Sequence, residues 1–300
     1  MVIVTATTSD LIVKTPQYVE EATEGTTPAA SPVFISCGPV SMLSIKNDGK
    51  FIEVGQIGAE DLVGISQGNQ SNEFQIKFTL LNSAFLKYCV NAANYPTPTG
   101  TISKSLSILF SFWLNGVTES FVIFKGTRCK DVTITCESGK AHEVTASFIC
   151  TTMTTPGAHG LTTPSFAATP SGTPWNFTDG GSLPLTWNAV GLNAKKFSIT
   201  INRNAQPEYI LGQTDPVTVQ PHGRKIGGDF SVLETVVTLE TEFKAVPPLA
   251  RTVAMVLKSA TSTITGLTSY LVNYNRDVDD TASDSVVENI NFKCLSVNVT

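Results

Sequence analysis

The densest group of potential metal ligands lies between residues 129 and 150. Cys129, Cys136, His142 and Cys150 fall in this span, and cysteine with histidine is a usual ligand set for zinc. The segment nevertheless contains no Cys-x-x-Cys pair, and no second ligand pair follows it. Residues 129 and 136 differ by an odd number, so along one strand we expect their side chains on opposite faces of the sheet. We therefore interpret the cysteines as reduced core residues and predict no metal or other cofactor.

The histidines and the glycine-rich segments form no catalytic pattern. His142 follows the turn "ESGK" and is expected in solvent, while His159 and His222 each lie beside a glycine in a Pro/Gly-rich segment. No Ser-His-Asp arrangement and no Gly-x-Ser-x-Gly elbow between a strand and a helix are visible. The stretch "GRKIGG" precedes an expected strand, whereas a phosphate-binding loop opens a helix. These observations predict a protein that is not an enzyme.

One acidic stretch, "NRDVDD" at residues 275–280, concentrates three aspartates and raises the possibility of a calcium site. It lacks the fixed glycine and the distal glutamate of a helix-loop-helix calcium loop. An acidic turn between Tyr274 and the next strand is the favoured interpretation.

The negative net charge argues against a protein that binds nucleic acid tightly. The net charge is −5, and charged residues make up 15% of the chain, against about 25% in typical domains. Such a chain has no basic footprint for phosphates. The N-terminus lacks the basic and apolar regions of a signal peptide, and the most apolar stretch, 105–124, is interrupted by polar residues, so we expect a soluble chain. The Asn115–Gly116 pair in that stretch instead predicts two strands joined by a turn.

Alternation with period two dominates the chain and predicts half-buried antiparallel strands. Helical spacing is weak, and the two best helical segments lie near 82–92 and 238–245, each after a strand. The residues expected to face the core include Leu43, Ile45, Phe74, Ile76, Phe78, Leu80, Val132, Ile134, Val144, Ala146, Phe148, Phe197, Ile199, Ile201, Ile290 and Phe292.

The two halves of the chain resemble each other across a Thr/Pro/Gly-rich segment. Residues 40–55 align with 194–212, and both are followed by a polar, glycine-bearing loop and a returning strand. Near the ends, Phe148 aligns with Phe292, and Asp131 is aligned with Asp277. The predicted organisation is an N-terminal arm (1–34), a first β domain (35–153), a linker (154–184) and a second β domain (185–300).

Two segments resemble tail tube proteins of long, non-contractile-tailed phages and related viruses. They are "KKFSITINRNAQPEYILGQ…VQPHGRKIGGDFSV" and "GTRCKDVTITCESGKAHEVTASFICTTM". The resemblance implies a mainly β fold with two tandem tail-tube-like β-sandwich or half-barrel domains, each with a short flanking helix. It also implies a structural virion protein that self-assembles, in host cytoplasm, into stacked rings conducting DNA through the viral tail. With a duplicated domain, three chains would form a ring with pseudo-sixfold symmetry.

The resemblance further implies partners and contact residues. The expected partners are other copies of the chain and the tail terminator, tape-measure and distal tail proteins; DNA would pass without specific binding, and no membrane is involved. The alternative is a carbohydrate-binding or adhesin β-sandwich. The polar loops of the two halves are the candidates for contacts between stacked rings, and two strand residues are the candidates for the lumen. The stacking candidates are Gln56, Glu60, Asp61, Gln213, Asp215, His222, Arg224 and Lys225; the lumen candidates are Glu73 and Glu143.

Overall fold

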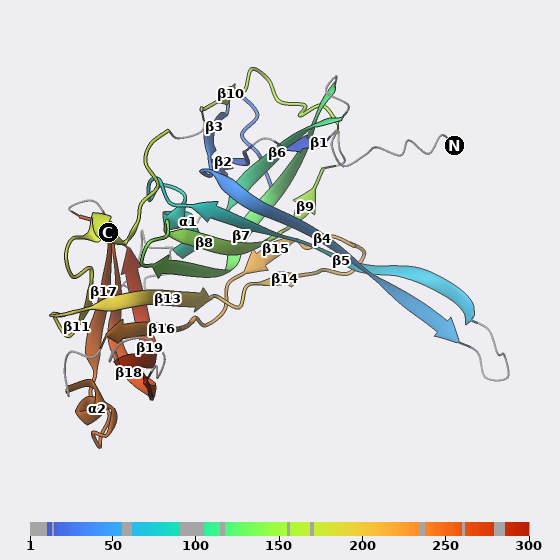
Figure 1. The fold of residues 1–300 in the computed structure, drawn as a ribbon. Coiled ribbons are helices and arrows are strands. Elements are labelled where there is room, and N and C mark those ends of the chain that lie inside the picture. The colour runs from blue at the N-terminus through green and yellow to red at the C-terminus, as the bar shows by residue number, and fades with distance from the viewer. Residues whose placement is uncertain are drawn as a thin grey trace.

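The protein is mainly β, as the alternation predicts. Two short helices, α1 (Leu86–Val90) and α2 (Thr238–Phe243), fall inside the two segments expected to be helical. In Figure 1 the strands gather into one broad body, from which a long hairpin projects. The structure is a computed structural model that describes residues 11–13, 15–55, 62–90, 105–114, 118–154, 157–168, 171–233, 238–259, 262–278 and 286–299.

The first half is built on four antiparallel strands in the order β4-β5-β8-β7. Strand β6 pairs with the beginning of β7, which confirms the predicted hairpin; its turn lies outside the described residues. The projecting hairpin is β4 with β5 (Figure 1). The bounds are β4 (Val40–Gly55), β5 (Leu62–Thr79), β6 (Leu106–Leu114), β7 (Thr118–Glu137) and β8 (Glu143–Cys150).

The segments predicted as an arm and a linker also carry short strands. β1 and β2 pair with β6, and β3 pairs with β2 and β10. β9, at the end of the predicted first domain, pairs with β7, and a single turn of 3-10 helix, η3 (Phe177–Gly180), precedes the second half. The bounds are β1 (Leu11–Val13), β2 (Gln17–Glu20), β3 (Val33–Ser36), β9 (Thr152–Met153) and β10 (Ser165–Phe166).

The second half repeats the pairing order of the first. Its four central strands run β13-β16-β19-β18, β17 pairs with the beginning of β18, and α2 follows β16 as α1 follows β5. β11 pairs with β12 and β17, and β14 pairs with β15 in a separate hairpin. The bounds are β11 (Leu185–Trp187), β12 (Val190–Leu192), β13 (Ala194–Asn202), β14 (Gln206–Glu208), β15 (Thr218–Gln220), β16 (Lys225–Leu233), β17 (Arg251–Lys258), β18 (Ser262–Val278) and β19 (Val286–Val299).

Three ladder irregularities recur at the same places in both halves. A bulge adds one residue to one strand and bends it, so its position is a specific feature of a ladder. Each irregularity at the start of β4, at the start of β6 and within β7 has a counterpart in β13, β17 and β18. The pairs are Val40/Met42 with Ala194/Lys196, Leu106/Ile108 with Arg251/Val253, and Cys129/Asp131 with Leu271/Asn273.

The backbone detail beside the second irregularity is repeated as well. Gly126 has φ +61° and its counterpart Thr268 has φ +52°, a region that L-residues with a branched Cβ rarely adopt. The next residue closes the turn in both halves: Thr127 Oγ1 and Ser269 Oγ each donate to the carbonyl three residues earlier, at 3.0 Å. Residues at the same ladder position in the two halves are called equivalent below.

The bulge in β7 overturns one inference from spacing. Cys129 and Cys136 are both buried, on the same face, because the additional residue between Cys129 and Asp131 shifts the phase of alternation. The ladders also correct part of the alignment. Asp131 pairs with Ser147 and is equivalent to Asn273, four residues before Asp277, whereas Phe148 and Phe292 are equivalent as predicted.

A continuous apolar core extends through both halves. In the first half the ring of Phe74 stacks on Phe148 at 5.1 Å, and in the second half Phe197 stacks on Phe292 at 6.0 Å. Burial of such rings and of the β-branched residues around them is the main source of stability for this fold.

Candidate assembly interfaces

The two halves are joined edge to edge by a ladder between β7 and β13. Ile134 lies opposite Ile199, and both side chains are fully buried on the core face. On the other face, the hydroxyls of Thr133 and Thr200 are 2.9 Å apart. This internal seam, defined as the ladder of residues 131–137 with 196–202, makes one sheet of the two halves.

The equivalents of both seam strands are open at the outer edges of the same sheet. Among the described residues, β4 has ladder partners only in β5, and residues 270–278 of β18 have them only in β19. The side chains reflect this difference. Ile45 is 45% exposed, whereas its equivalent Ile199 is 0% exposed; Tyr274 is half-buried, whereas its equivalent Val132 is fully buried. Unpaired edges with exposed apolar residues are templates for another chain.

Both lumen candidates lie on the polar face of the sheet, and both are in ion pairs. Glu73 contacts Lys130 at 2.9 Å, and Glu143 contacts Lys77 at 2.9 Å. A third pair, Lys196 with Asp229 at 3.2 Å, lies on the same face of the second half. The face is therefore charge-balanced at these positions rather than strongly acidic.

The polar loop of the second half, residues 203–224, is called the second finger. This finger crosses the internal seam and contacts the first half. Tyr209 donates to the carbonyl of Gln70 at 2.7 Å, and the Gln70 N–H donates to the carbonyl of Thr214 at 2.8 Å. Ile149 of β8 is buried in a small cluster with Ala205 and Val219 of the finger.

A half-buried carboxylate also ties the second finger to the first half. Glu24 accepts hydrogen bonds from the Val219 N–H and the Thr218 hydroxyl, and contacts Arg128 at 2.7 Å. Burial opposes ionisation of Glu24, but the hydrogen bonds from Arg128 and Val219 outweigh it, so the pKa lies below its ordinary value.

The predicted stacking residues of the second finger are spread over its tip and base. Gln213 is exposed at the tip, Asp215 is half-buried beside it, and His222 is exposed near the base. Arg224 is half-buried and donates to the carbonyl of Val90 at 3.4 Å, while Lys225 is exposed at the start of β16. The first-half candidates Gln56, Glu60 and Asp61 lie outside the described residues.

Sequence reasoning missed the apolar residues at this tip. Leu211 is 103% exposed, and Ile210 and Val217 are about half exposed. The available signal was an apolar pair between Pro207 and Pro216 in an otherwise polar loop. Exposed apolar side chains on a projecting loop are typical of an interaction site.

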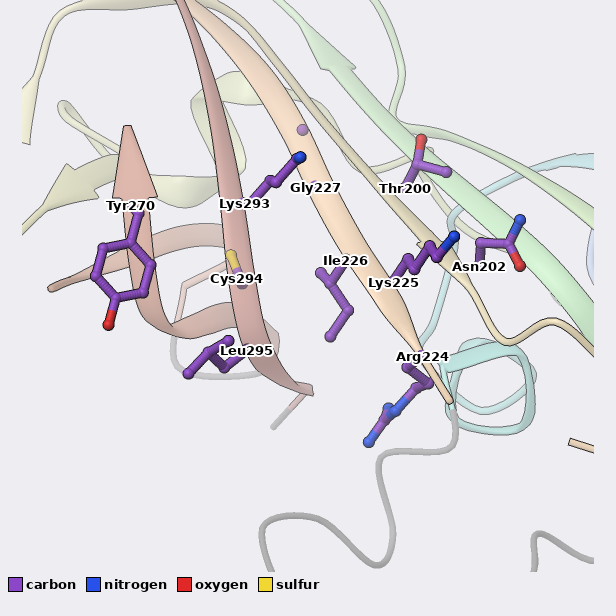
Figure 2. A pocket seen from close by; sticks show the side chains of 11 residues that line it. Thr200, Asn202, Arg224, Lys225, Ile226, Gly227, Tyr270, Lys293, Cys294 and Leu295 are labelled. Atoms are coloured by element: carbon purple, nitrogen blue, oxygen red, sulfur yellow. The ribbon is translucent and has the colours of Figure 1, made fainter. Parts of the chain in front are cut away.

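A cavity of about 630 Å³ lies on the polar face of the second half, at the ends of β16 and β19 (Figure 2). Its walls carry the cations of Arg224, Lys225 and Lys293, together with Tyr270 and Leu295. Gly227 and Gly228 line the cavity as well, so no side chain from these two positions fills it.

The potential ligands identified in the sequence are structural in the described part of the chain. All six cysteines are buried free thiols, and burial raises the pKa of Cys37 and Cys136. No group of three or more His, Cys, Asp or Glu side chains with metal-binding geometry occurs among the described residues. Asp277 is a ladder residue of β18 rather than part of a turn, and residues 279–280 lie outside the described set.

The expectation of a solvated His142 was wrong. The side chain is fully buried, because the segment before β11 folds over it: the backbone N–H of His142 donates to the Trp175 carbonyl at 2.7 Å, and Phe177 meets the imidazole edge-on. Burial lowers the pKa of His142 to about 4.

Three further findings bear on the class of protein. None of the described helices has the length and apolarity needed to cross a bilayer. A search of curated proteins finds no match. A family model described as "Phage tail tube protein" matches residues 17–294. That match spans both halves and the seam between them, and with it the chain belongs to the phage tail tube protein family.

Proposed function

We propose that three copies of this chain close into a ring of six tube units and that such rings stack into a tail tube that conducts DNA. The observation that carries the proposal is the internal seam together with its two open equivalents. Within one chain the seam joins one half to the other, and the two strands at the open edges are those that would be needed to repeat this joint between copies. A heterologous joint of this kind generates a closed ring when the rotation returns to the start.

The internal register predicts the register between copies. Ile199 lies opposite Ile134 in the seam, so Ile45 of one copy would lie opposite Arg276 of the next. By the same equivalence Leu43 would lie opposite Val278. Closure would then bury Ile45 as Ile199 is buried. The repeated bulges support the view that the two units, predicted as 35–153 and 185–300, arose by duplication.

The polar face of the sheet is the proposed lining of the channel. Its carboxylates Glu73 and Glu143 are held by lysines, so these positions offer phosphates no excess of positive charge. Phosphates are then not trapped there, because clustered cations without carboxylate partners would be required to hold them. This arrangement supports passage of DNA without specific binding.

The exposed tip of the second finger is the proposed contact to the adjacent ring. Gln213 and Asp215 lie there beside the exposed Leu211. The assembled tube would be part of the virion tail, built in the host cytoplasm, with terminator, tape-measure and distal tail proteins at its ends. An adhesin would need exposed aromatic platforms, and both Trp175 and Trp187 are buried. The proposed role is structural, without enzymatic activity.

The test is mass photometry and negative-stain electron microscopy of the purified chain over a concentration series. We expect rings or tubes with a constant central hole that dissociate to trimers of about three times 32.0 kDa. Rings of six full-length chains would contradict the pseudo-sixfold arrangement, and a chain that stays monomeric at every concentration, even with tail terminator or tape-measure protein added, would contradict self-assembly.

A further inference from the structure

We propose that the cavity on the second half is the seat for the β4–β5 hairpin of a neighbouring copy. The inference rests on the proposed ring and adds a second contact to it. It follows from comparing the two halves of one chain: the first half carries a finger on its polar face at the place where the second half has the cavity.

The seat of the second finger on the first half is defined by three residues. Gln70 exchanges hydrogen bonds with the finger, Ile149 packs against it, and Arg128 reaches it through Glu24. These residues come from β5, β8 and β7, the three strands nearest the internal seam on the polar face.

The counterparts of these three residues in the second half all line the cavity. Ile149 pairs with Glu73 and Arg128, and Lys293 pairs with Gly227 and Tyr270, so Lys293 is equivalent to Ile149 and Tyr270 to Arg128. Counting along β5 and β16 makes Arg224 equivalent to Gln70.

All three line the same cavity and are labelled in Figure 2. The cavity therefore occupies the position at which a finger would lie if the second half received one as the first half does.

Among the described residues, the β4–β5 hairpin is the segment equivalent to the second finger. That finger leaves the sheet after β13, and the β4–β5 hairpin leaves the body at the same point after the equivalent part of β4. A ladder irregularity between Gly49 and Phe51 falls at this point, and a bulge is where a hairpin bends. The seven residues of β4 from Gly49 to Gly55 extend about 23 Å at ~3.3 Å per residue, enough to cross a neighbouring strand pair.

Charge also matches this occupant to this cavity. The lining carries three cations, Arg224, Lys225 and Lys293, and no carboxylate. The hairpin sequence from 50 to 64 contains one lysine and three acids, Glu53, Glu60 and Asp61. Opposite charges in the two segments favour their association. In the first half, where the finger comes from the same chain, Ile149 replaces the cation of Lys293.

This assignment changes the role of the first-half loop candidates. Gln56, Glu60 and Asp61 would then contact a neighbour in the same ring, and the second-finger tip alone would reach the adjacent ring. The hairpin would cross the seam from β4 and bind the copy that contributes β18.

The test places a photo-cross-linker on the hairpin of the full-length chain, as Ile52→p-benzoylphenylalanine, with Val54→p-benzoylphenylalanine as a second placement in case one impairs assembly. Assembled rings are irradiated and the linked peptides are mapped by mass spectrometry. We expect covalent dimers in which the hairpin is joined to residues 224–228 or 293–295 of another copy. Rings whose cross-links map elsewhere, or to the same chain, overturn the inference and leave the proposed ring intact.

A charge reversal provides an independent readout. Lys293→Glu should raise the concentration needed for half-assembly about tenfold without lowering the unfolding midpoint, because repulsion replaces attraction at the seat. Lys140→Glu, at an exposed lysine outside the cavity, is the matched control and should leave assembly unchanged. Equal effects of the two variants would overturn the seat. Failure of the unsubstituted chain to assemble, even with tail terminator or tape-measure protein added, would overturn the proposed ring, and this inference with it.

Discussion

Ile45 provides the sharpest test of the seam, because the chain contains its own controls. In the isolated chain its side chain is 45% exposed, whereas its equivalent Ile199 is fully buried at the internal seam. Full burial of an isoleucine contributes about 1.5–3 kcal/mol, so covering the exposed 45% of Ile45 contributes about 1 kcal/mol per seam. Over three seams, Ile45→Ala should weaken ring formation by about 3 kcal/mol, or roughly 100-fold.

The same substitution at two other isoleucines separates assembly from folding. Ile199→Ala should lower the free energy of unfolding by about 2–5 kcal/mol, because it opens a cavity in the core. Ile35→Ala removes a side chain of nearly the same exposure, 44%, from β3, which lies outside the seam, and should change neither property. Urea unfolding and mass photometry measure the two quantities. The reasoning is refuted if Ile45→Ala assembles like the unsubstituted chain, or if Ile35→Ala impairs rings equally.

Three further predictions follow from single sites. The pKa of His142 is about 4 in the folded chain against about 6.5 in the unfolded chain, so the unfolded state binds more protons between these pH values. The free energy of unfolding should therefore fall by about 3 kcal/mol as pH drops from 6.5 to 4. A His142→Gln variant with the same pH slope in urea unfolding would contradict this. The pKa of Glu24 is lowered in the folded chain, so its contribution to stability is present above its unfolded pKa and is lost as pH falls. Glu24→Gln should increase hydrogen exchange of residues 206–220 at neutral pH. Unchanged exchange would contradict the proposed contact between Glu24 and the second finger. Thr268→Gly should raise the free energy of unfolding by about 1 kcal/mol, because it relieves a positive φ. Gly126→Ala should lower the free energy of unfolding, because a Cβ there would lie 2.3 Å from Thr151 Oγ1. Thermal unfolding that shows the opposite order would refute the equivalence of the two turns.

The alternation of apolar and polar residues predicted the half-buried strands, because it depends on neighbouring residues in the sequence alone. Alternating Phe74, Ile76 and Phe78 predicted a half-buried strand, and all three are buried. Two failures occurred where one residue changes the phase or where a distant segment covers a side chain. The bulge beside Cys129 shifted the alternation, and the segment around Trp175 buried His142. A third is Ile45, which was expected to face the core but is exposed because β4 lies at an open edge.

The candidate site was predictable only in outline. Glu73 and Glu143 were expected on a polar face and lie there, but their lysine partners come from other strands and could not be paired from spacing. The second finger was expected to project, yet it is held by Glu24, almost two hundred residues earlier in the sequence. Such contacts are invisible to any local window because they depend on which strands become neighbours.

The sequence by itself determined the β class, the two helices, the similarity of the halves and the family resemblance, because these follow from periodicity and from segments read in order. Only the tertiary structure decided which edges are joined and which stay open. The seam between β7 and β13, the exposure of Ile45 and the cavity beside Lys293 all arise from strand order, and strand order is fixed by the packing of the whole sheet rather than by any one strand.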